Sequence, residues 1–272
     1  MVRRGRSLFA SAEEGVVSRL YRATARRQAA VSVALGVSVL LAWYLIALVG
    51  QYPTYILPRP DEVVSKAARV LADGSLWRHA RTTLVEVLAG LSTGIGLALI
   101  FGYVLAKWEW FERVLSPYIA AAQSVPMVAL APLLAVWFGF GLLSKVLVCA
   151  AIVFFPMMVT TIVGIRSAPD DLMDLMRAMR ASRWQVFAKL EVPAALPILF
   201  GGLRLSVTLA VVGAVVGEFV GADRGLGFLV NLSKGLFDTP LMFVALATLM
   251  LIAVALYATV LFLERKLLSW RY

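Results

Sequence analysis

The chain has 272 residues, of which 61% are hydrophobic and only 15% are charged, and its formal net charge is +10. An ordinary soluble domain is about 45–50% apolar and about 25% charged, so the composition indicates a membrane protein. The basic residues gather near the chain ends and between apolar runs, which favours charge beside a membrane over a nucleic-acid surface. A single cysteine, Cys149, excludes an internal disulfide framework and a cysteine metal site, and we expect it to be a small core residue.

Residues 1–28 form a basic segment rich in arginine, and an apolar run follows from about Gln28 to Gly50. This run is too long for a signal-peptide core of about 7–15 residues, so we predict a retained membrane span. A charge excess of this kind keeps a segment in the cytoplasm, which sets the predicted orientation.

A membrane-spanning helix needs roughly 20 predominantly apolar residues. Six stretches meet this requirement, at residues 29–50, 83–106, 115–138, 143–165, 196–219 and 241–263. The predicted fold is therefore an all-α integral membrane protein with six transmembrane helices and both termini in the cytoplasm. Its transmembrane domain covers residues 29–265, followed by a cytoplasmic tail at 266–272.

The basic residues of the connections at 107–114 and 166–195 agree with this orientation, because cytoplasmic loops carry an excess of Lys and Arg. The loop at 51–82, predicted to be external, departs from the rule. It contains Arg59, Lys66, Arg69, Arg78 and Arg81, against only Asp61, Glu62 and Asp73.

Two groups of polar residues lie within the predicted spans. Gln123 and Ser124 lie between Pro117 and Pro126, and a helix broken by proline frees backbone carbonyls that only protein or a water-filled cavity can surround. This predicts that the third span lines the translocation path, although a kink made for packing is an alternative.

Glu86 and Glu218 lie near the outer ends of the second and fifth spans. Charges at membrane depth are costly and indicate function, so both are candidates for the path. The alternative is that they lie at interfacial depth, where they snorkel or stabilise a helix end.

The run Asp223–Gly227 is rich in glycine, which indicates a tight turn or a re-entrant element on the outer face, with contact to an external protein as the alternative. His79 is a lone histidine in the external loop and has no metal-binding companions, so we expect a surface residue and no metal site.

The segment 170–187 has apolar residues at near-helical spacing, with charged residues on the rest of the wheel. Pro169 and Asp170 suit a helix start, and the sequence predicts two short helices. Such a segment either lies on the lipid surface or docks a soluble partner. The apolar positions are Leu172, Leu175, Met176, Met179, Val186 and Phe187.

The run A-S-R-W-Q-V-F (181–187), followed by V-P-A-A-L-P and G-L-R-L, resembles the cytoplasmic coupling loop of binding-protein-dependent ABC importer permeases. The first half departs from that family: Asp174 replaces Glu, Leu175–Met176 replaces Ala–Ala, and Arg180 replaces Gly. Stretches at 55–63, 126–141, 154–156 and 217–230 resemble the nitrate/sulfonate/taurine branch, with 217–230 most similar to permeases for riboflavin or a thiamine precursor.

The resemblance implies a permease in the cell membrane that works with two ATPase subunits, a second permease subunit and an extracytoplasmic binding protein. The chain has no G-x-x-x-x-G-K-[ST] motif, so we expect it to be no enzyme and to hold no cofactor, with ATP and Mg²⁺ bound by the ATPase. The coupling loop, residues 166–197, would dock the ATPase through Asp174, Leu175, Met176, Arg177, Met179, Arg180, Ser182, Arg183, Trp184 and Phe187.

The resemblance favours riboflavin or a related vitamin or precursor heterocycle as the solute, with a nitrate, sulfonate or taurine permease as the alternative. A secondary transporter coupled to protons through Glu86 and Glu218 is a second alternative, and an assembly subunit without a transport path is a third. Neither of these last two alternatives explains why the run A-S-R-W-Q-V-F is followed by prolines just before the next predicted span.

Overall fold

The computed structural model of the protein describes residue 31 and residues 34–269. These residues contain helices, turns and irregular segments but no strand, which confirms the all-helical class. The chain divides into two compact units, Met1–Val64 and Ser65–Tyr272. The predicted boundary at residue 28 lies outside the described residues.

In the first unit, an apolar helix at Ala34–Val49 is followed by a loop. The Trp43 indole N–H donates a hydrogen bond to the Pro58 carbonyl at 3.1 Å, which folds this loop back toward the helix. The helix as described is shorter than the roughly 20 residues that a span requires. The predicted span at 29–50 therefore stays a prediction, since its start lies outside the described part.

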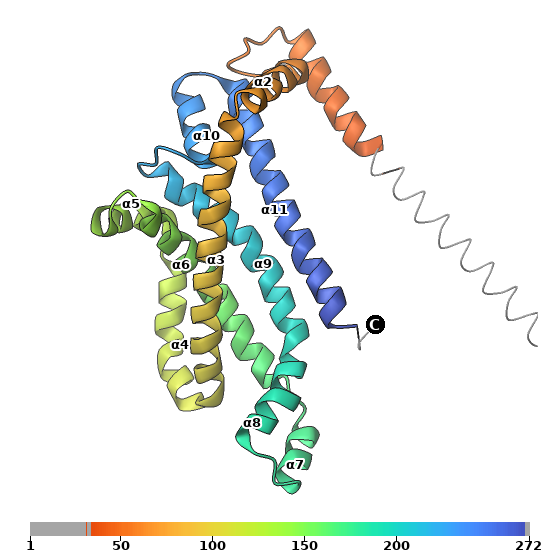
Figure 1. Cartoon of the computed structure of the whole chain (residues 1–272), viewed down its shortest axis with the longest axis vertical. Helices are drawn as coiled ribbons and strands as arrows, with labels where there is room; N and C mark the ends of the chain where they lie inside the picture. Colours follow the sequence, from red (N-terminus) through yellow and green to blue (C-terminus); the bar gives the residue numbers. More distant parts are fainter. Residues whose placement is uncertain (1–30, 32–33, 270–272) are drawn as a thin grey trace, which may run out of the picture. The chain divides into compact units, whose positions relative to one another are not determined.

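Helix α2, Pro60–Ala72, carries the chain across the division between the units. The second unit then contains a series of long and short helices (Figure 1). They are α3 (Ser75–Lys107), α4 (Glu109–Ser124), α5 (Met127–Phe138), α6 (Leu142–Arg166), α7 (Asp170–Ala178), α8 (Arg183–Val186), a π-helical turn (Phe187–Glu191), α9 (Val192–Phe219), α10 (Leu226–Gly235) and α11 (Thr239–Leu267).

Helices α3 and α6 pack side by side and run in the same direction, because Gly90 faces Cys149 and Gly102 faces Thr161. A methyl group added at Gly102 would lie 2.6 Å from the Thr161 Cβ, so the missing side chains allow the two backbones to approach closely. Small residues at such contacts are the usual means by which helices associate in a membrane.

Helix α9 packs against both α6 and α3 and runs against α6, because Gly202 faces Thr160 and Gly217 faces Lys145. Cys149 lies where the three helices meet: it is fully buried, and its thiol contacts the Ala210 carbonyl at 3.3 Å. This confirms the prediction that Cys149 is a core residue.

Four long apolar helices match the predicted second, fourth, fifth and sixth spans. They are Ser75–Lys107, Leu142–Arg166, Arg183–Phe219 and Thr239–Leu267. The predicted third span is not one continuous helix, because α4 and α5 meet at an angle of 90°. Pro126 explains the break: a residue before proline avoids the helical region, and Val125 is extended with ψ of 121°.

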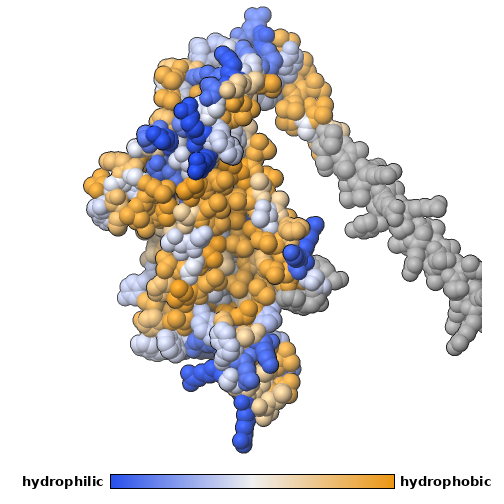
Figure 2. Space-filling view, in the orientation of Figure 1, coloured by the Kyte–Doolittle hydropathy of each residue, from blue (hydrophilic) through white to orange (hydrophobic). Residues whose placement is uncertain are grey.

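Figure 2 shows an apolar band over the middle of the visible face of the second unit, with hydrophilic residues gathered toward its two ends. Large apolar side chains are exposed along α3, α5 and α11. Soluble proteins rarely expose a continuous apolar surface of this extent. This is the surface of a protein that crosses the membrane several times.

Candidate functional site

The coupling segment, residues 166–197, lies at the end of the bundle where α6 finishes and α9 begins (Figure 1). It contains the short helices α7 and α8, as predicted, and α8 continues through the π-helical turn into α9. Proline at 169 and acidic residues in the first turn start α7 in the way that the sequence indicated.

Helix α7 ends at Ala178, and Arg180, two residues later, adopts a left-handed conformation with φ of 53°. The Arg180 N–H donates to the Arg177 carbonyl and the Ala181 N–H donates to the Met176 carbonyl, each at 2.9 Å. This hydrogen-bond pattern closes a helix around a left-handed residue, usually glycine. Arg180 has a Cβ, so the turn keeps this shape without the residue that it prefers.

We expect Arg180→Gly to stabilise the α7 turn by about 1 kcal/mol, because the left-handed conformation costs residues with a Cβ about 1–2 kcal/mol. Hydrogen exchange of the α7 amides should slow accordingly in the purified protein. Arg180→Ala is the matched control, since it removes the same side chain but keeps the Cβ. Equal protection in the two variants would contradict a backbone origin.

A capping box starts α8: Ser182 Oγ accepts the Gln185 N–H at 3.3 Å, and the Gln185 side chain accepts the Ser182 N–H at 2.7 Å. The Phe187 ring lies 5.3 Å from that of Trp184 and meets the ring of Tyr103 on α3 edge-on at 5.2 Å. Ser182 and Phe187, both predicted to dock a partner, thus shape the segment and hold it against α3.

Both ends of the coupling segment are tied to the end of α3, and one of them to α4 as well. Arg166 pairs with Glu112 of α4 at 2.6 Å and donates to the Leu105 carbonyl of α3 at 3.2 Å. At the other end, the buried Glu191 forms an ion pair with Lys107. Paired and hydrogen-bonded charges of this kind fix orientation, so these contacts hold both ends of the segment against the bundle.

The outer surface of the coupling segment exposes apolar side chains at a hydrophilic end of the molecule. Met179 and Trp184 are each 71% exposed, and Leu172 and Leu175 are exposed beside them. On the other face of α7, Asp174 and Arg177 pair at 2.9 Å, while Met176 is half-buried and Arg180 and Arg183 are exposed. Their docking role stays a prediction, and the exposed apolar face is its physical basis.

A second polar site lies at the opposite end of the bundle. Glu86 on α3, Lys145 on α6 and Glu218 on α9 are all buried, and Lys145 Nζ lies 3.1 Å from Glu86 Oε1. Thr83 Oγ1 donates to Glu218 Oε1 at 2.6 Å, and Thr83 precedes Glu86 by three residues on α3. We call these four residues the carboxylate cluster.

The snorkelling part of the alternative for Glu86 and Glu218 is wrong, whereas helix-end stabilisation agrees with the contacts of Glu218. Each is only 1% exposed, so neither side chain snorkels to the membrane surface. Instead, Glu218 accepts the N–H groups of Gly227 and Phe228 and thus caps the start of α10 across the chain.

His79 and Gly225 complete this arrangement. The Gly225 N–H donates to His79 Nδ1 at 3.0 Å, so the half-buried His79 is not a plain surface residue. Gly225 has φ of 119°, and a Cβ there would collide with the Glu218 carboxylate. The glycine-rich run is a turn, as expected, and it is built around the carboxylate cluster.

We expect Gly225→Ala to destabilise the protein by at least about 2 kcal/mol, because a strained conformation costs about 1–3 kcal/mol and the Glu218 hydrogen bonds are displaced as well. Thermal unfolding in detergent micelles measures the loss. Gly235→Ala is the control, since a Cβ at Gly235 meets nothing within 4 Å. If both variants unfolded at the same temperature, the proposed collision would not exist.

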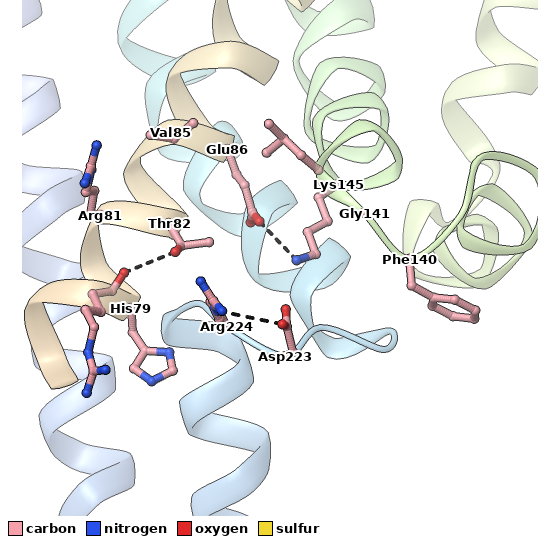
Figure 3. Close-up of a pocket in the computed structure, with 12 residues that line it drawn as sticks. His79, Arg81, Thr82, Val85, Glu86, Phe140, Gly141, Lys145, Asp223 and Arg224 are labelled. Carbon is pink, nitrogen blue, oxygen red and sulfur yellow. Dashed lines mark hydrogen bonds and ion pairs between the residues drawn. The ribbon is translucent and has the colours of Figure 1, made fainter.

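A cavity of about 700 Å³ opens beside the carboxylate cluster (Figure 3). Figure 3 shows Glu86 and Lys145 joined on one side of it and the Asp223–Arg224 turn on another. We call it the arginine cavity; its lining residues are Arg78, His79, Arg81, Thr82, Val85, Glu86, Phe140, Gly141, Leu142, Lys145, Asp223 and Arg224. Within the described residues, no group of three or more His, Cys, Asp or Glu could hold a metal ion.

The structure brings together only half of the predicted path residues. Glu86 and Glu218 both belong to the carboxylate cluster, whereas Gln123 and Ser124 are exposed at the α4–α5 bend. Sequence reasoning missed Lys145, although a lysine near the start of an apolar run was a signal for a buried partner.

Comparison with known proteins gives consistent results. The family described as "Binding-protein-dependent transport system inner membrane component" matches residues 94–269. The chain is 48% identical to the riboflavin transport system permease protein of Chloroflexus aurantiacus, over 85% of this chain and 87% of that one. It is 35% identical to the formylaminopyrimidine transport permease protein of Halalkalibacterium halodurans, over 86% and 92% of the two chains.

Among solved structures, a methionine ABC transporter in an inward-facing conformation superposes with a TM-score of 0.63. The match covers 71% of this chain and 95% of that one at 21% identity, so the likeness is one of fold.

Proposed function

Because the chain belongs to the binding-protein-dependent transport system inner membrane component family, and is thus an ABC importer permease of the cell membrane, we propose that it imports riboflavin or a related vitamin heterocycle. The similarity to the riboflavin permease, over most of both chains, is the observation that carries this proposal. The formylaminopyrimidine permease supports a thiamine precursor as the second candidate.

The proposed orientation places the coupling segment in the cytoplasm and α10 on the external side. Basic residues at the coupling end support it, since cytoplasmic connections retain Lys and Arg. They include Lys107, Arg113, Arg166, Arg177, Arg180, Arg183, Lys189, Arg265 and Lys266.

The partner proposed for the coupling segment is an ATPase subunit, one for each of two permease subunits. The apolar side chains of Leu175, Met179 and Trp184 would enter a groove of the ATPase, in the manner of an amphipathic helix in a hydrophobic cleft. Arg180 and Arg183 would form rim pairs that fix the orientation. ATP and Mg²⁺ would be bound by the ATPase, because this chain has no phosphate-binding loop motif.

The proposed mechanism is a two-state switch driven by the ATPases. Their closure on ATP would displace the coupling segment, and its ties to α3 and its continuity with α9 would carry that displacement into the bundle. Glu86 and Glu218, with Gln123 and Ser124 at the α4–α5 bend, are proposed as residues of the translocation path.

The test is ATP hydrolysis and solute uptake in vesicles that contain this chain, its ATPase and its binding protein. We expect stimulation by riboflavin, and by formylaminopyrimidine if the second candidate holds. Stimulation only by taurine, an alkanesulfonate or nitrate would overturn the vitamin assignment. Uptake that survives ATP depletion but stops when the proton gradient is collapsed would instead establish a secondary transporter.

A further inference from the structure

In the proposed orientation, the external end of the bundle carries arginine side chains that the preference of basic residues for the cytoplasm does not predict. Arg78 and Arg81 lie near the start of α3, in the stretch that departs from the rule that basic residues stay in the cytoplasm. Both line the arginine cavity. Retained positive charge on the external side therefore requires another reason.

The charges around the arginine cavity do not balance. Lys145 pairs with Glu86 at 3.1 Å, and Arg224 lies 3.7 Å from Asp223. Within the part of the chain that the structure describes, the exposed Arg78 and Arg81 make no ion pair. Four basic side chains thus face two acidic ones, and the two exposed guanidinium groups are available to an external anion.

The buried Glu86–Lys145 pair lines one part of the cavity, and its two charges neutralise each other. Arg224 directly precedes Gly225, whose N–H donates to His79, and its side chain is exposed. Guanidinium groups bind carboxylates in a bidentate geometry, so exposed arginines favour an acidic side chain.

We propose that the arginine cavity is the socket for an acidic side chain of the extracytoplasmic binding protein. This inference rests on the proposed function and adds the surface and the chemistry of docking. A vitamin heterocycle such as riboflavin is uncharged, so its binding does not need a cluster of arginines. An acidic side chain of a protein is bound by arginines, and opposite charges at an interface also speed association.

The experiment measures recruitment of the riboflavin-loaded binding protein to the intact permease–ATPase complex in lipid nanodiscs, at low and at physiological salt. Arg78→Glu with Arg81→Glu should raise Kd by about tenfold or more and abolish its salt dependence, because a docking arginine is a common hot spot. Arg78→Lys with Arg81→Lys, which keeps the charge, should retain the salt dependence and most of the affinity.

Lys234→Glu is the matched control, since Lys234 is an exposed cation on α10 that does not line the cavity. Thermal unfolding and ATPase assembly establish that each variant is folded. If the double charge reversal left Kd unchanged, or if it altered riboflavin uptake without altering Kd, the socket would be disproved and the riboflavin permease would stand. If the unaltered complex recruited no binding protein, the proposed function would fall together with the socket.

Discussion

Lys145→Met is expected to destabilise the folded permease by about 3–5 kcal/mol, because it leaves buried carboxylates without their cation. Within the described part of the chain, Lys145 is the one basic side chain that pairs with a glutamate of the carboxylate cluster. Methionine fills a similar volume, so the loss reports charge and not packing. Thermal unfolding in detergent micelles, with the fraction of monodisperse protein, measures it.

The control for this prediction is the double variant Lys145→Met with Glu86→Gln. Replacing both members of a buried ion pair removes the uncompensated charge, so we expect the double variant to recover most of the lost stability. A double variant as unstable as Lys145→Met alone would show that the pair with Glu86 is not what Lys145 supplies. Glu218 would then be its principal partner.

Met179→Asp is expected to separate ATP hydrolysis from transport by weakening docking of the ATPase about a hundredfold or more. Met179 is 71% exposed in the isolated chain, so the aspartate itself is tolerated in the unassembled protein. In the assembled importer, the charge would be buried in an apolar groove without a partner, which costs about 3–5 kcal/mol. Co-purification of the ATPase and riboflavin uptake measure the effect.

Met179→Leu is the matched variant, because it keeps an apolar side chain of similar size at the same place, and it should assemble and transport normally. Normal assembly and uptake by Met179→Asp would show that Met179 lies outside the docking face. Failure of Met179→Asp to fold on its own would also contradict the prediction, since its exposure in the isolated chain predicts normal thermal stability.

Local sequence patterns predicted much of this fold. A run of about 20 apolar residues has few structural alternatives in a membrane, and the helices that contain 83–106, 143–165, 196–219 and 241–263 follow that rule. The two short helices of the coupling segment followed from spacing and from Pro169. The straight third span failed because Pro117 and Pro132 are tolerated within helices whereas Pro126 ends one, and the neighbours of each proline decide which occurs.

The carboxylate cluster could not be predicted in the same way. Glu86, Lys145 and Glu218 come from three helices, and each alone looks like a charge near the end of an apolar run. Only the glycine contacts that draw α3, α6 and α9 together place them side by side. Hydropathy reports the environment of one segment, and pairing between distant segments is invisible to it.

The continuous helix from Arg183 to Phe219 would amplify movement in the proposed mechanism, because it is long. Its 37 residues extend about 55 Å, at about 1.5 Å for each residue. A tilt of about 5° at the coupling end would therefore carry the far end sideways by about 5 Å, roughly the diameter of a small side chain. The π-helical turn at Phe187–Glu191, which Lys107 contacts through Glu191, lies near the coupling end of this helix. In the proposed orientation, a small displacement on the cytoplasmic side would thus become a larger one on the external side.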